Sequence, residues 1–167
     1  AQFTQMLVSV NSKYDRYVAG KESLTEQEMT GLTLFRNRCS SCHPEPLFTD
    51  YSFRNIGLLP DSAIADSGRA HITGQASDRS KFKVPSLRNV EMTYPYMHDG
   101  RFKNLQQVLK HYGKGKFHGD NVDPDVKLNV GLTRNQRADL VAFLKTLTDT
   151  DFLNDERFGE PEAVDSK

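Results

Sequence analysis

The stretch CSSCH, residues 39–43, constrains the fold of this chain more than any other feature of its sequence. It holds both cysteines of the chain, Cys39 and Cys42, and His43 follows directly. Two cysteines at this spacing occur in redox disulfides, in zinc sites and at points of covalent haem attachment. The surrounding sequence distinguishes among these alternatives.

Covalent haem attachment fits the pentapeptide best. A c-type haem needs two thiols to add to its vinyl groups and an imidazole to bind its iron, and Cys39, Cys42 and His43 supply all three. A tetrahedral zinc site needs a second pair of ligands at similar spacing, and the remaining histidines form no such pair. A thioredoxin-like motif follows a strand, whereas a capped helix is expected before Cys39. We therefore expect one covalent haem c, with His43 as the proximal ligand, in a periplasmic or otherwise exported protein.

Composition agrees with a cofactor-dependent core. The chain has 167 residues, 37% of them hydrophobic and none of them Trp, so it would gain from an apolar cofactor to pack around. Lys+Arg and Asp+Glu balance at 22 each, which gives no reason to expect nucleic acid as a partner. No apolar run of about 18 residues predicts a membrane span. No signal peptide is visible, and since a helical pattern starts at once, we expect that a leader or an upstream domain has been removed.

Hydrophobic spacing predicts four helices. The first covers residues 1 to about 20, from the i, i+3, i+4 and i+7 spacing of Phe3, Met6, Leu7 and Val10. Two others begin at capping boxes, one at Thr25 with Glu28 and one at Thr133 with Gln136. The remaining helix is LQQVLKHY, residues 105–112. The helix that begins at Thr25 would bring Cys39 to its C-terminal end.

A long loop region separates the second helix from the third. Residues 44–102 are rich in Gly, Pro, Ser and Asp, with short strands expected near Tyr51–Ile56 and Phe82–Val84. A loop of this length is unusual in a compact domain unless it wraps around something. The expected fold is therefore mainly α: a class I cytochrome c-like domain over residues 1–150, with helices and long loops around one covalent haem c. Residues 151–167 are expected to form a surface tail.

Several stretches together resemble the C-terminal haem domain of the bacterial dihaem cytochrome c peroxidase and MauG superfamily. They are LVSVNSKYDRYVAG, LTEQEMTGLTLFRNRCSSCH, GRAHITG, FKVPSLRNVEMTYPYMHDGRF, LQQVLKHY and LTRNQRADLVAFLKTLTD. Members carry two haem domains, and the resemblance implies that the N-terminal haem meets peroxide while the C-terminal haem supplies electrons or shares the oxidising charge. This chain has a single CxxCH, so the resemblance implies a fragment or one subunit of a split protein, without the N-terminal haem domain.

The resemblance implies a relay of electrons from a small donor protein, a cytochrome c or a cupredoxin, to a peroxide-reducing haem in the missing N-terminal domain or subunit. The parent protein would be an oxidoreductase of the cytochrome c peroxidase class, and this chain alone would not be a competent peroxidase. One alternative is a MauG-type enzyme that oxidises a protein substrate. Another is a free-standing electron shuttle. The sequence leaves the oligomeric state open.

The sixth ligand of the haem iron separates these alternatives. In the peroxidases, the resemblance places a methionine one helix after PYMHDG, and in this chain Tyr112 stands there, as in MauG-type members. Spacing from Val108 and Leu109 also turns Tyr112 toward the apolar face of its helix. A phenolate favours ferric iron, whereas a thioether favours ferrous iron. Met97 is the alternative ligand, and a tyrosine that only packs in the core is the plainer reading of Tyr112.

Other residues are candidates by resemblance or by charge. Thr93 and Pro95 match a position where backbone carbonyls of the family bind calcium at the domain interface. Arg88 and Arg101 are candidates to pair with haem propionates, because guanidinium groups suit carboxylates, although solvated surface arginines are the plainer reading. His71, His111 and His118 carry no motif and are expected at the surface or in loops. The basic stretch KHYGKGK would either steer an acidic partner or be a solvated loop.

Overall fold

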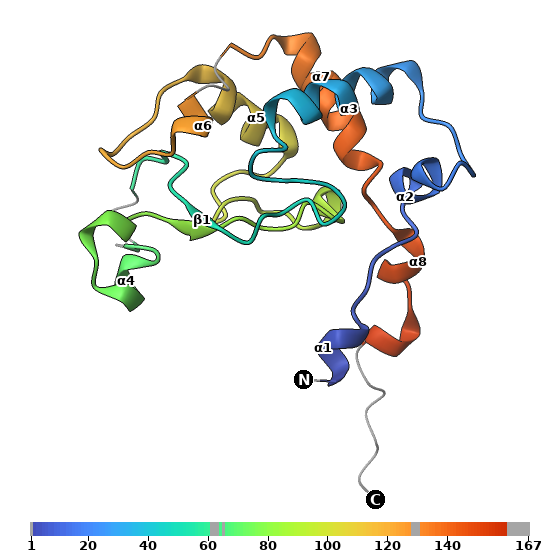
Figure 1. Cartoon of the computed structure of the whole chain (residues 1–167), viewed down its shortest axis with the longest axis horizontal. Helices are drawn as coiled ribbons and strands as arrows, with labels where there is room; N and C mark the ends of the chain where they lie inside the picture. The colour runs from blue at the N-terminus through green and yellow to red at the C-terminus, as the bar shows by residue number, and fades with distance from the viewer. Residues whose placement is uncertain (1, 61–63, 65, 128–130, 160–167) are drawn as a thin grey trace, which may run out of the picture.

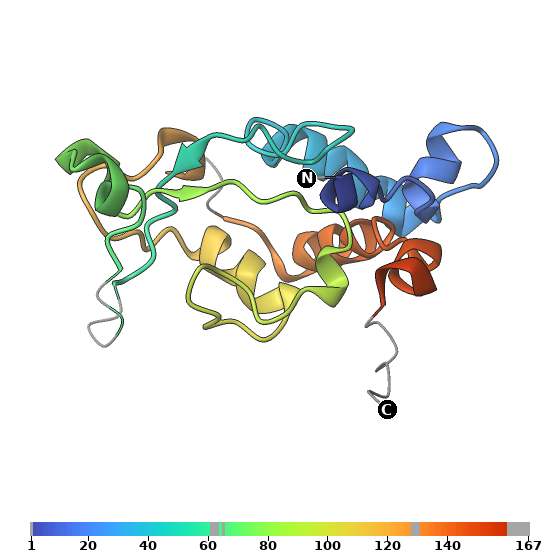
Figure 2. The same cartoon turned by 90° about the horizontal axis from the view of Figure 1, so that it is seen from below.

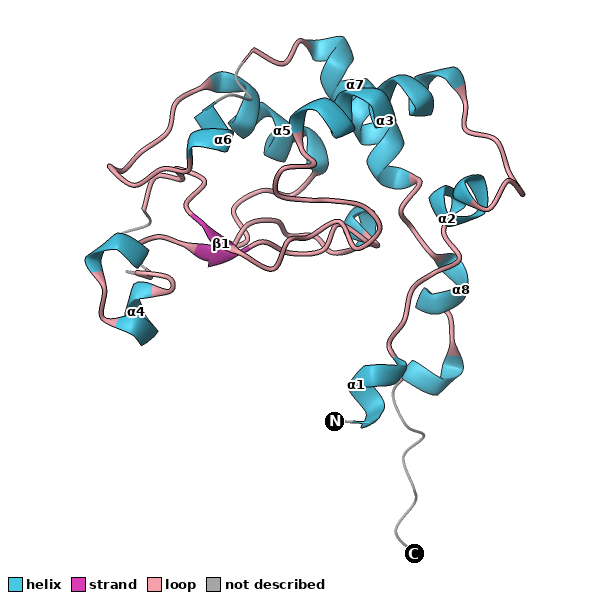
Figure 3. Ribbon diagram, in the orientation of Figure 1, coloured by secondary structure: helices cyan, strands magenta, loops and turns pink. Residues whose placement is uncertain are grey.

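The computed structural model describes residues 2–60, 64, 66–127 and 131–159, and most of its regular structure is helical (Figures 1 and 3). The α-helices are α1 (Gln2–Met6), α2 (Lys13–Val18), α3 (Glu26–Arg38), α4 (Ala70–Thr73), α5 (Leu105–Lys114), α6 (Pro124–Lys127), α7 (Arg134–Lys145) and α8 (Thr150–Leu153). Short 3-10 helices cover Ala76–Asp78, Val90–Met92 and Glu156–Phe158. Strands β1 (Phe53–Arg54) and β2 (Phe82–Lys83) pair antiparallel, with Phe53 opposite Lys83. Both strands fall within the expected ranges.

Helices α3 and α7 cross at the centre of the core (Figure 1). Both begin at the expected capping boxes, at Thr25 and Thr133. Gly31 makes the crossing close, because a Cβ atom at this position would lie 2.0 Å from the carbonyl oxygen of Asp139. Phe35 of α3 and Phe143 of α7 are almost wholly buried, with ring centroids 5.0 Å apart. The end of α3, where the CSSCH turn starts, is thus anchored in the core.

The segment between α3 and α5 is mostly loop, as its composition predicts, and runs along one side of the helices (Figure 3). Its two halves are joined at β1 and β2 and by the Thr49 hydroxyl, which donates a hydrogen bond to the Val84 carbonyl over 2.7 Å. Helix α5 is two residues longer than expected and ends at Gly115, whose φ of 65° is left-handed. The fold therefore surrounds the CSSCH turn with loops on one side and α5 on another.

The N-terminal prediction was wrong, because residues 1 to 20 do not form one helix. Helix α1 ends at Met6, and α2 starts only at Lys13, behind Ser12 as N-cap. Ser12 and Asp15 form a capping box, in which the Ser12 hydroxyl accepts from the Asp15 amide and the Asp15 carboxylate accepts from the Ser12 amide over 2.9 Å. The apolar spacing of Phe3, Met6 and Val10 indicated a longer helix, but these side chains are 53–63% exposed and pack against no core.

The C-terminal segment folds back beside the N-terminus (Figure 1). Its rings join the two ends, since Phe158 lies 6.1 Å from Phe3 and 5.5 Å from Phe152. Residues 160–167 of the expected tail lie outside the described residues, so the boundary at residue 150 stays a prediction. Within the described ranges, no helix combines the length and the hydropathy that crossing a bilayer requires.

Candidate functional site

The CSSCH turn continues directly from the last turn of α3. Cys39 caps this helix, and its amide donates to the carbonyl of Phe35 over 2.7 Å. The amides of Cys42 and His43 both donate to the carbonyl of Cys39, over 3.2 and 2.9 Å. The two thiols are free, and burial raises the pKa of Cys39 to about 12 and also raises that of Cys42. Helical continuation thus brings both thiols and the imidazole to one partly buried turn.

His43 is oriented by a backbone carbonyl. Its Nδ1 lies 2.8 Å from the carbonyl oxygen of Phe48, so Nδ1 carries the proton and Nε2 keeps its lone pair. Phe48 is fully buried and has a φ of 55°, a conformation that costs about 1–3 kcal/mol for residues other than glycine. Burial also lowers the pKa of His43, which favours the neutral imidazole that metals require. This is the arrangement of a metal-binding histidine.

Tyr112 faces the same turn from α5. Burial raises the pKa of its phenol, and the nearby Cys39 and Cys42 raise it further. Tyr112 is half-buried, and no hydrogen bond of its hydroxyl to another described residue is found. Since no fully buried side-chain oxygen of the described residues lacks a partner, this hydroxyl keeps some contact with solvent. Figure 2 shows α5, in yellow, on the opposite side of the molecule from the cyan segment that follows Cys39.

Met97 lies in the loop before α5. It is half-buried, and its φ of 72° is left-handed, a strained conformation for methionine. The Met97 carbonyl accepts from the Gly100 amide over 3.3 Å. Of the two candidate sixth ligands, Tyr112 lies near enough to Cys39 and Cys42 for them to raise its pKa, and the assignment of the sixth ligand stays a prediction.

These residues fit a covalent haem c. The two thiols are unpaired, the imidazole keeps its Nε2 lone pair, and a phenol without a partner faces the thiols. The described ranges contain no cluster of three or more His, Cys, Asp or Glu side chains suited to a metal ion. The zinc alternative thus finds no further ligands among these residues.

The two candidate propionate partners are engaged with groups of the protein itself. Arg88 pairs with Asp15 over 2.9 and 3.0 Å and donates to the Pro46 carbonyl over 2.8 Å. Arg101 pairs with Asp99, whose side chain is 2% exposed, and this guanidinium lowers the pKa of Asp99. Arg88 joins α2 to the loop after His43, which is a structural role. The structure does not bring either arginine together with the CSSCH turn.

Thr93 and Pro95, the candidate calcium residues, are exposed and lie in the turn after the 3-10 helix Val90–Met92. The Thr93 hydroxyl donates to the Val90 carbonyl over 3.3 Å. Pro95 packs close to Gly100, where a Cβ atom would lie 3.1 Å from its ring. The turn is thus fixed by local contacts, and calcium binding by its carbonyls stays a prediction.

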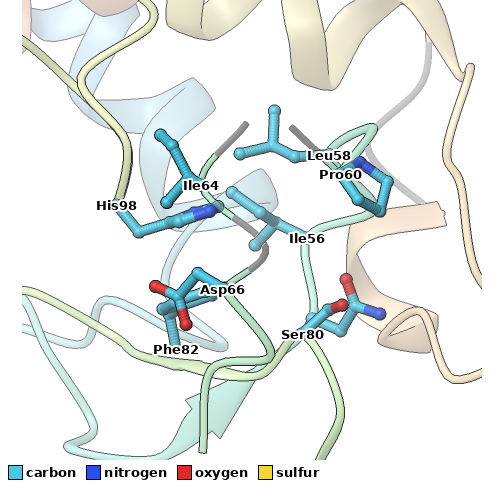
Figure 4. A pocket seen from close by; sticks show the side chains of 9 residues that line it. Ile56, Leu58, Pro60, Ile64, Asp66, Ser80, Phe82 and His98 are labelled. Carbon is cyan, nitrogen blue, oxygen red and sulfur yellow. The ribbon is translucent and has the colours of Figure 1, made fainter. Parts of the chain in front are cut away.

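A small pocket lies on the loop side of α5 (Figure 4). It is lined by Asn55, Ile56, Leu58, Pro60, Ile64, Asp66, Ser80, Phe82 and His98. The rings of His98 and Phe82 stack with centroids 3.7 Å apart. His111, the neighbour of Tyr112, has its Nε2 2.9 Å from the Ile56 carbonyl. The loop that lines the pocket is therefore tied to α5 beside Tyr112.

Three residues without a sequence motif organise this site, and the expectation for one of them was wrong, since His111 is half-buried in α5 and not in a loop or at the surface. They are Phe48, whose carbonyl orients His43; His111, which ties α5 to the wrapping loop; and Arg54. Arg54 pairs with Asp50, Asp123 and Asp125 over 2.9–3.1 Å and reaches the Ser41 carbonyl inside the CSSCH turn. No local signal marks them, because each acts on a partner that is distant in sequence or acts through its backbone.

The chain is similar to known cytochrome c proteins. A family model described as "Cytochrome c" matches residues 28–148. The cytochrome c551 peroxidase of Nitrosomonas europaea is 36% identical, over 89% of this chain and 42% of that protein. The methylamine utilization protein MauG of Methylorubrum extorquens is 39% identical, over 88% of this chain and 42% of that protein. The chain thus spans less than half the length of these two relatives.

Two solved structures have a fold similar to that of this chain, which again spans about half of each. A MauG-like protein associated with microbial copper homeostasis has a TM-score of 0.81 and 33% identity, over 92% of this chain and 52% of its own. The diheme peroxidase BthA of Burkholderia thailandensis has a TM-score of 0.68 and 28% identity, over 86% and 48% of the two chains. The expected mainly α, class I cytochrome c-like fold and the resemblance to these proteins are confirmed.

Proposed function

Because this chain belongs to the cytochrome c family and is related to cytochrome c peroxidases and MauG proteins, we propose that it is the electron-transfer haem c domain of such a protein. It would relay electrons to a peroxide-reducing haem in an N-terminal domain or subunit. One observation carries the proposal: the free thiols of Cys39 and Cys42 share one turn with His43, whose Nδ1 is held by the Phe48 carbonyl so that Nε2 keeps its lone pair for a metal.

Each residue of the site has a defined role. Cys39 and Cys42 would form thioethers with one haem c, and His43 would bind its iron through Nε2. The bound haem supplies an iron that takes up and releases one electron. The Phe48 carbonyl holds the imidazole in one tautomer and one orientation, so that the ligand does not rotate between redox states. Tyr112 would occupy the sixth position and close the iron to peroxide.

A MauG-type role is the second candidate, and Tyr112 is the observation that favours it. A phenolate is a hard, anionic ligand that stabilises ferric and higher states of iron. An iron with this ligand holds an oxidising equivalent better than it accepts an electron from a high-potential donor. In that case the parent protein would oxidise a residue of another protein, and this domain would share the charge.

The proposal extends to the surroundings of the domain. Its donor would be a small electron-transfer protein, a cytochrome c or a cupredoxin, and the location would be periplasmic or otherwise exported, where haem c is attached. Calcium bound by the carbonyls of Thr93 and Pro95 would belong to the interface with the N-terminal domain. The observation in support is that the chain spans only 42% of the cytochrome c551 peroxidase to which it is similar.

The test is spectroscopic. The chain is produced with haem-attachment machinery, and covalent haem is measured in the wild type, Cys39→Ala and Cys42→Ala; we expect the wild type alone to hold haem through two thioethers. The ferric absorption and EPR spectra of the wild type are then compared with those of Tyr112→Phe. A phenolate charge-transfer band that disappears in Tyr112→Phe supports the Tyr112 assignment. A near-infrared thioether band in both would assign Met97 and an ordinary high-potential relay.

A further inference from the structure

Helix α5 has two faces of opposite character. Leu105 and Leu109 are buried on one side, where Tyr112 also turns inward. Lys110 and Lys114 are exposed and lie one turn apart on the other side. Exposed lysines also flank the helix, Lys103 before its first turn and Lys116 after its last. We call Lys103, Lys110, Lys114 and Lys116 the α5 lysine face.

This face has a single sign of charge. Residues 101–119 contain no Asp or Glu, although the whole chain is formally neutral. Arg101 is engaged with Asp99, whereas the four lysines form no ion pair with any residue in the described ranges. Some other lysines are paired, for example Lys13 with Glu28 over 2.7 Å and Lys145 with Glu91 over 2.8 Å, and the unpaired ones elsewhere in the described ranges include Lys21 and Lys127. The α5 lysine face is therefore a locally positive part of the surface of a formally neutral chain.

The like charges on α5 lower the stability of the helix, and the fold does not require them. Like charges one helical turn apart, as at Lys110 and Lys114, destabilise a helix by about 0.2–0.5 kcal/mol. Lys114 gains from the negative end of the helix dipole, but Lys103 stands at the positive end. A surface that only needs solubility intersperses both signs of charge. Stability and solubility thus leave the uniform sign unexplained.

We propose that the α5 lysine face is the docking site for the acidic surface of a protein that exchanges electrons with the haem site. The inference rests on the proposed function and adds the chemistry of the partner. Helix α5 carries Tyr112 toward the cysteines, so a partner on its outer side is separated from the haem site by about one helix diameter, roughly 10 Å. Opposite charges raise the rate of encounter by about 10- to 1,000-fold.

A protein fits this face better than a membrane does. Lysine-rich surfaces that bind bilayers combine their charge with exposed apolar or aromatic side chains that insert. Between residues 103 and 119, all of which the structure describes, no large hydrophobic side chain is exposed. The face therefore offers charge without an apolar anchor, which suits a transient protein complex that forms and separates quickly.

The test uses charge reversal at two places. Lys110→Glu/Lys114→Glu is compared with Lys21→Glu/Lys127→Glu, which changes the net charge by the same amount at exposed, unpaired lysines elsewhere in the described ranges. Stopped flow measures oxidation of the ferrous, haem-loaded chain by anionic hexacyanoferrate(III) and by cationic tris(phenanthroline)cobalt(III). We expect Lys110→Glu/Lys114→Glu to slow oxidation by the anionic reagent about tenfold and to accelerate oxidation by the cationic reagent. We expect the control pair to change both oxidation rates by less than twofold. High salt should remove the difference.

Equal effects of the two pairs, or no effect of either, would overturn the proposal, because net charge alone or no steering would then explain the rates. A second measurement needs no haem: binding of a fluorescent polyglutamate peptide and of phosphatidylserine vesicles. We expect the peptide to bind the wild type and the control pair but not Lys110→Glu/Lys114→Glu. Lysine-dependent binding of vesicles without binding of the peptide would identify a membrane surface instead. Failure to attach haem would contradict the proposed function and not this inference.

Discussion

At the scale of single residues, buried polar groups connect segments that are distant in sequence. Asp149 is only 2% exposed. Its carboxylate accepts hydrogen bonds from the Asn11 amide over 2.9 Å, the Phe152 amide over 3.0 Å and the Ser9 hydroxyl over 3.1 Å. Its own amide donates to the Asn89 side chain over 2.7 Å. The carboxylate of Asp149 therefore fastens the N-terminal segment to the start of α8, and its backbone amide fastens the turn at Asn89.

Asp149 should make the free energy of unfolding of the chain depend on pH. Burial alone would raise its pKa, but hydrogen bonds from Asn11, Phe152 and Ser9 outweigh burial and lower the pKa below the ordinary 3.8. Its stabilisation is therefore complete well above pH 3.8 and is lost as the pH falls through the lower pKa of the folded state.

We expect Asp149→Asn to lower the free energy of unfolding by about 1–3 kcal/mol at pH 7 and by less near pH 3. Urea denaturation of both proteins across this range measures the difference, with Asp120→Asn as the control, since Asp120 is exposed. A difference that stays constant from pH 7 to pH 3 would contradict the role of the Asp149 charge.

The imidazole of His43 illustrates what residue patterns predict and what they omit. Cys39, Cys42 and His43 were predicted as a set, because the chemistry of haem attachment fixes their order and spacing. Phe48 was not, because it acts through a carbonyl, which every residue has. Arg88 and Arg101 pair with Asp15 and Asp99, and their contact with haem propionates stays a prediction.

At the scale of elements, the crossing of α3 and α7 depends on the absence of a side chain. Gly31→Ala should destabilise the chain by about 1–3 kcal/mol or more, because the added Cβ would lie 2.0 Å from the Asp139 carbonyl and force the helices apart. Thermal unfolding measures the loss. Thr30→Ala on the exposed side of α3 is the control, and we expect it to change stability by less than about 0.5 kcal/mol. Equal stability of Gly31→Ala and the wild type would show that the helices separate at no cost.

Local signals located helix starts better than they located helix lengths. The capping boxes at Thr25 and Thr133 were predicted and confirmed, and the box at Ser12 was present but overlooked beside a helical apolar pattern. That pattern misled because Phe3, Met6 and Val10 face no core. Hydrophobic spacing predicts a helix only when another element covers the apolar face.

At the scale of the whole molecule, the chain spans about half the length of its relatives, and we expect the haem-loaded chain alone to have little peroxidase activity. With Tyr112 in the sixth position, peroxide would find no open site on the iron. A steady-state assay with hydrogen peroxide and reduced cytochrome c measures this, and rapid turnover by the chain would contradict it. Tyr112→Phe provides the comparison, since an opened iron should react with peroxide faster than the wild type.

The sequence by itself determined the two main helix starts and the mainly α, cytochrome c-like fold, and it predicted the site of cofactor attachment, because these depend on residues that are neighbours in the chain. Only the tertiary structure decided that Phe48 orients His43 and that Arg54 joins the CSSCH turn to Asp123. It also decided that Tyr112 faces the thiols while the lysines of α5 face outward. The reason is physical: orientation and pairing depend on which groups approach across the wrapped loops, and that proximity exists only once α3, α7 and α5 have packed.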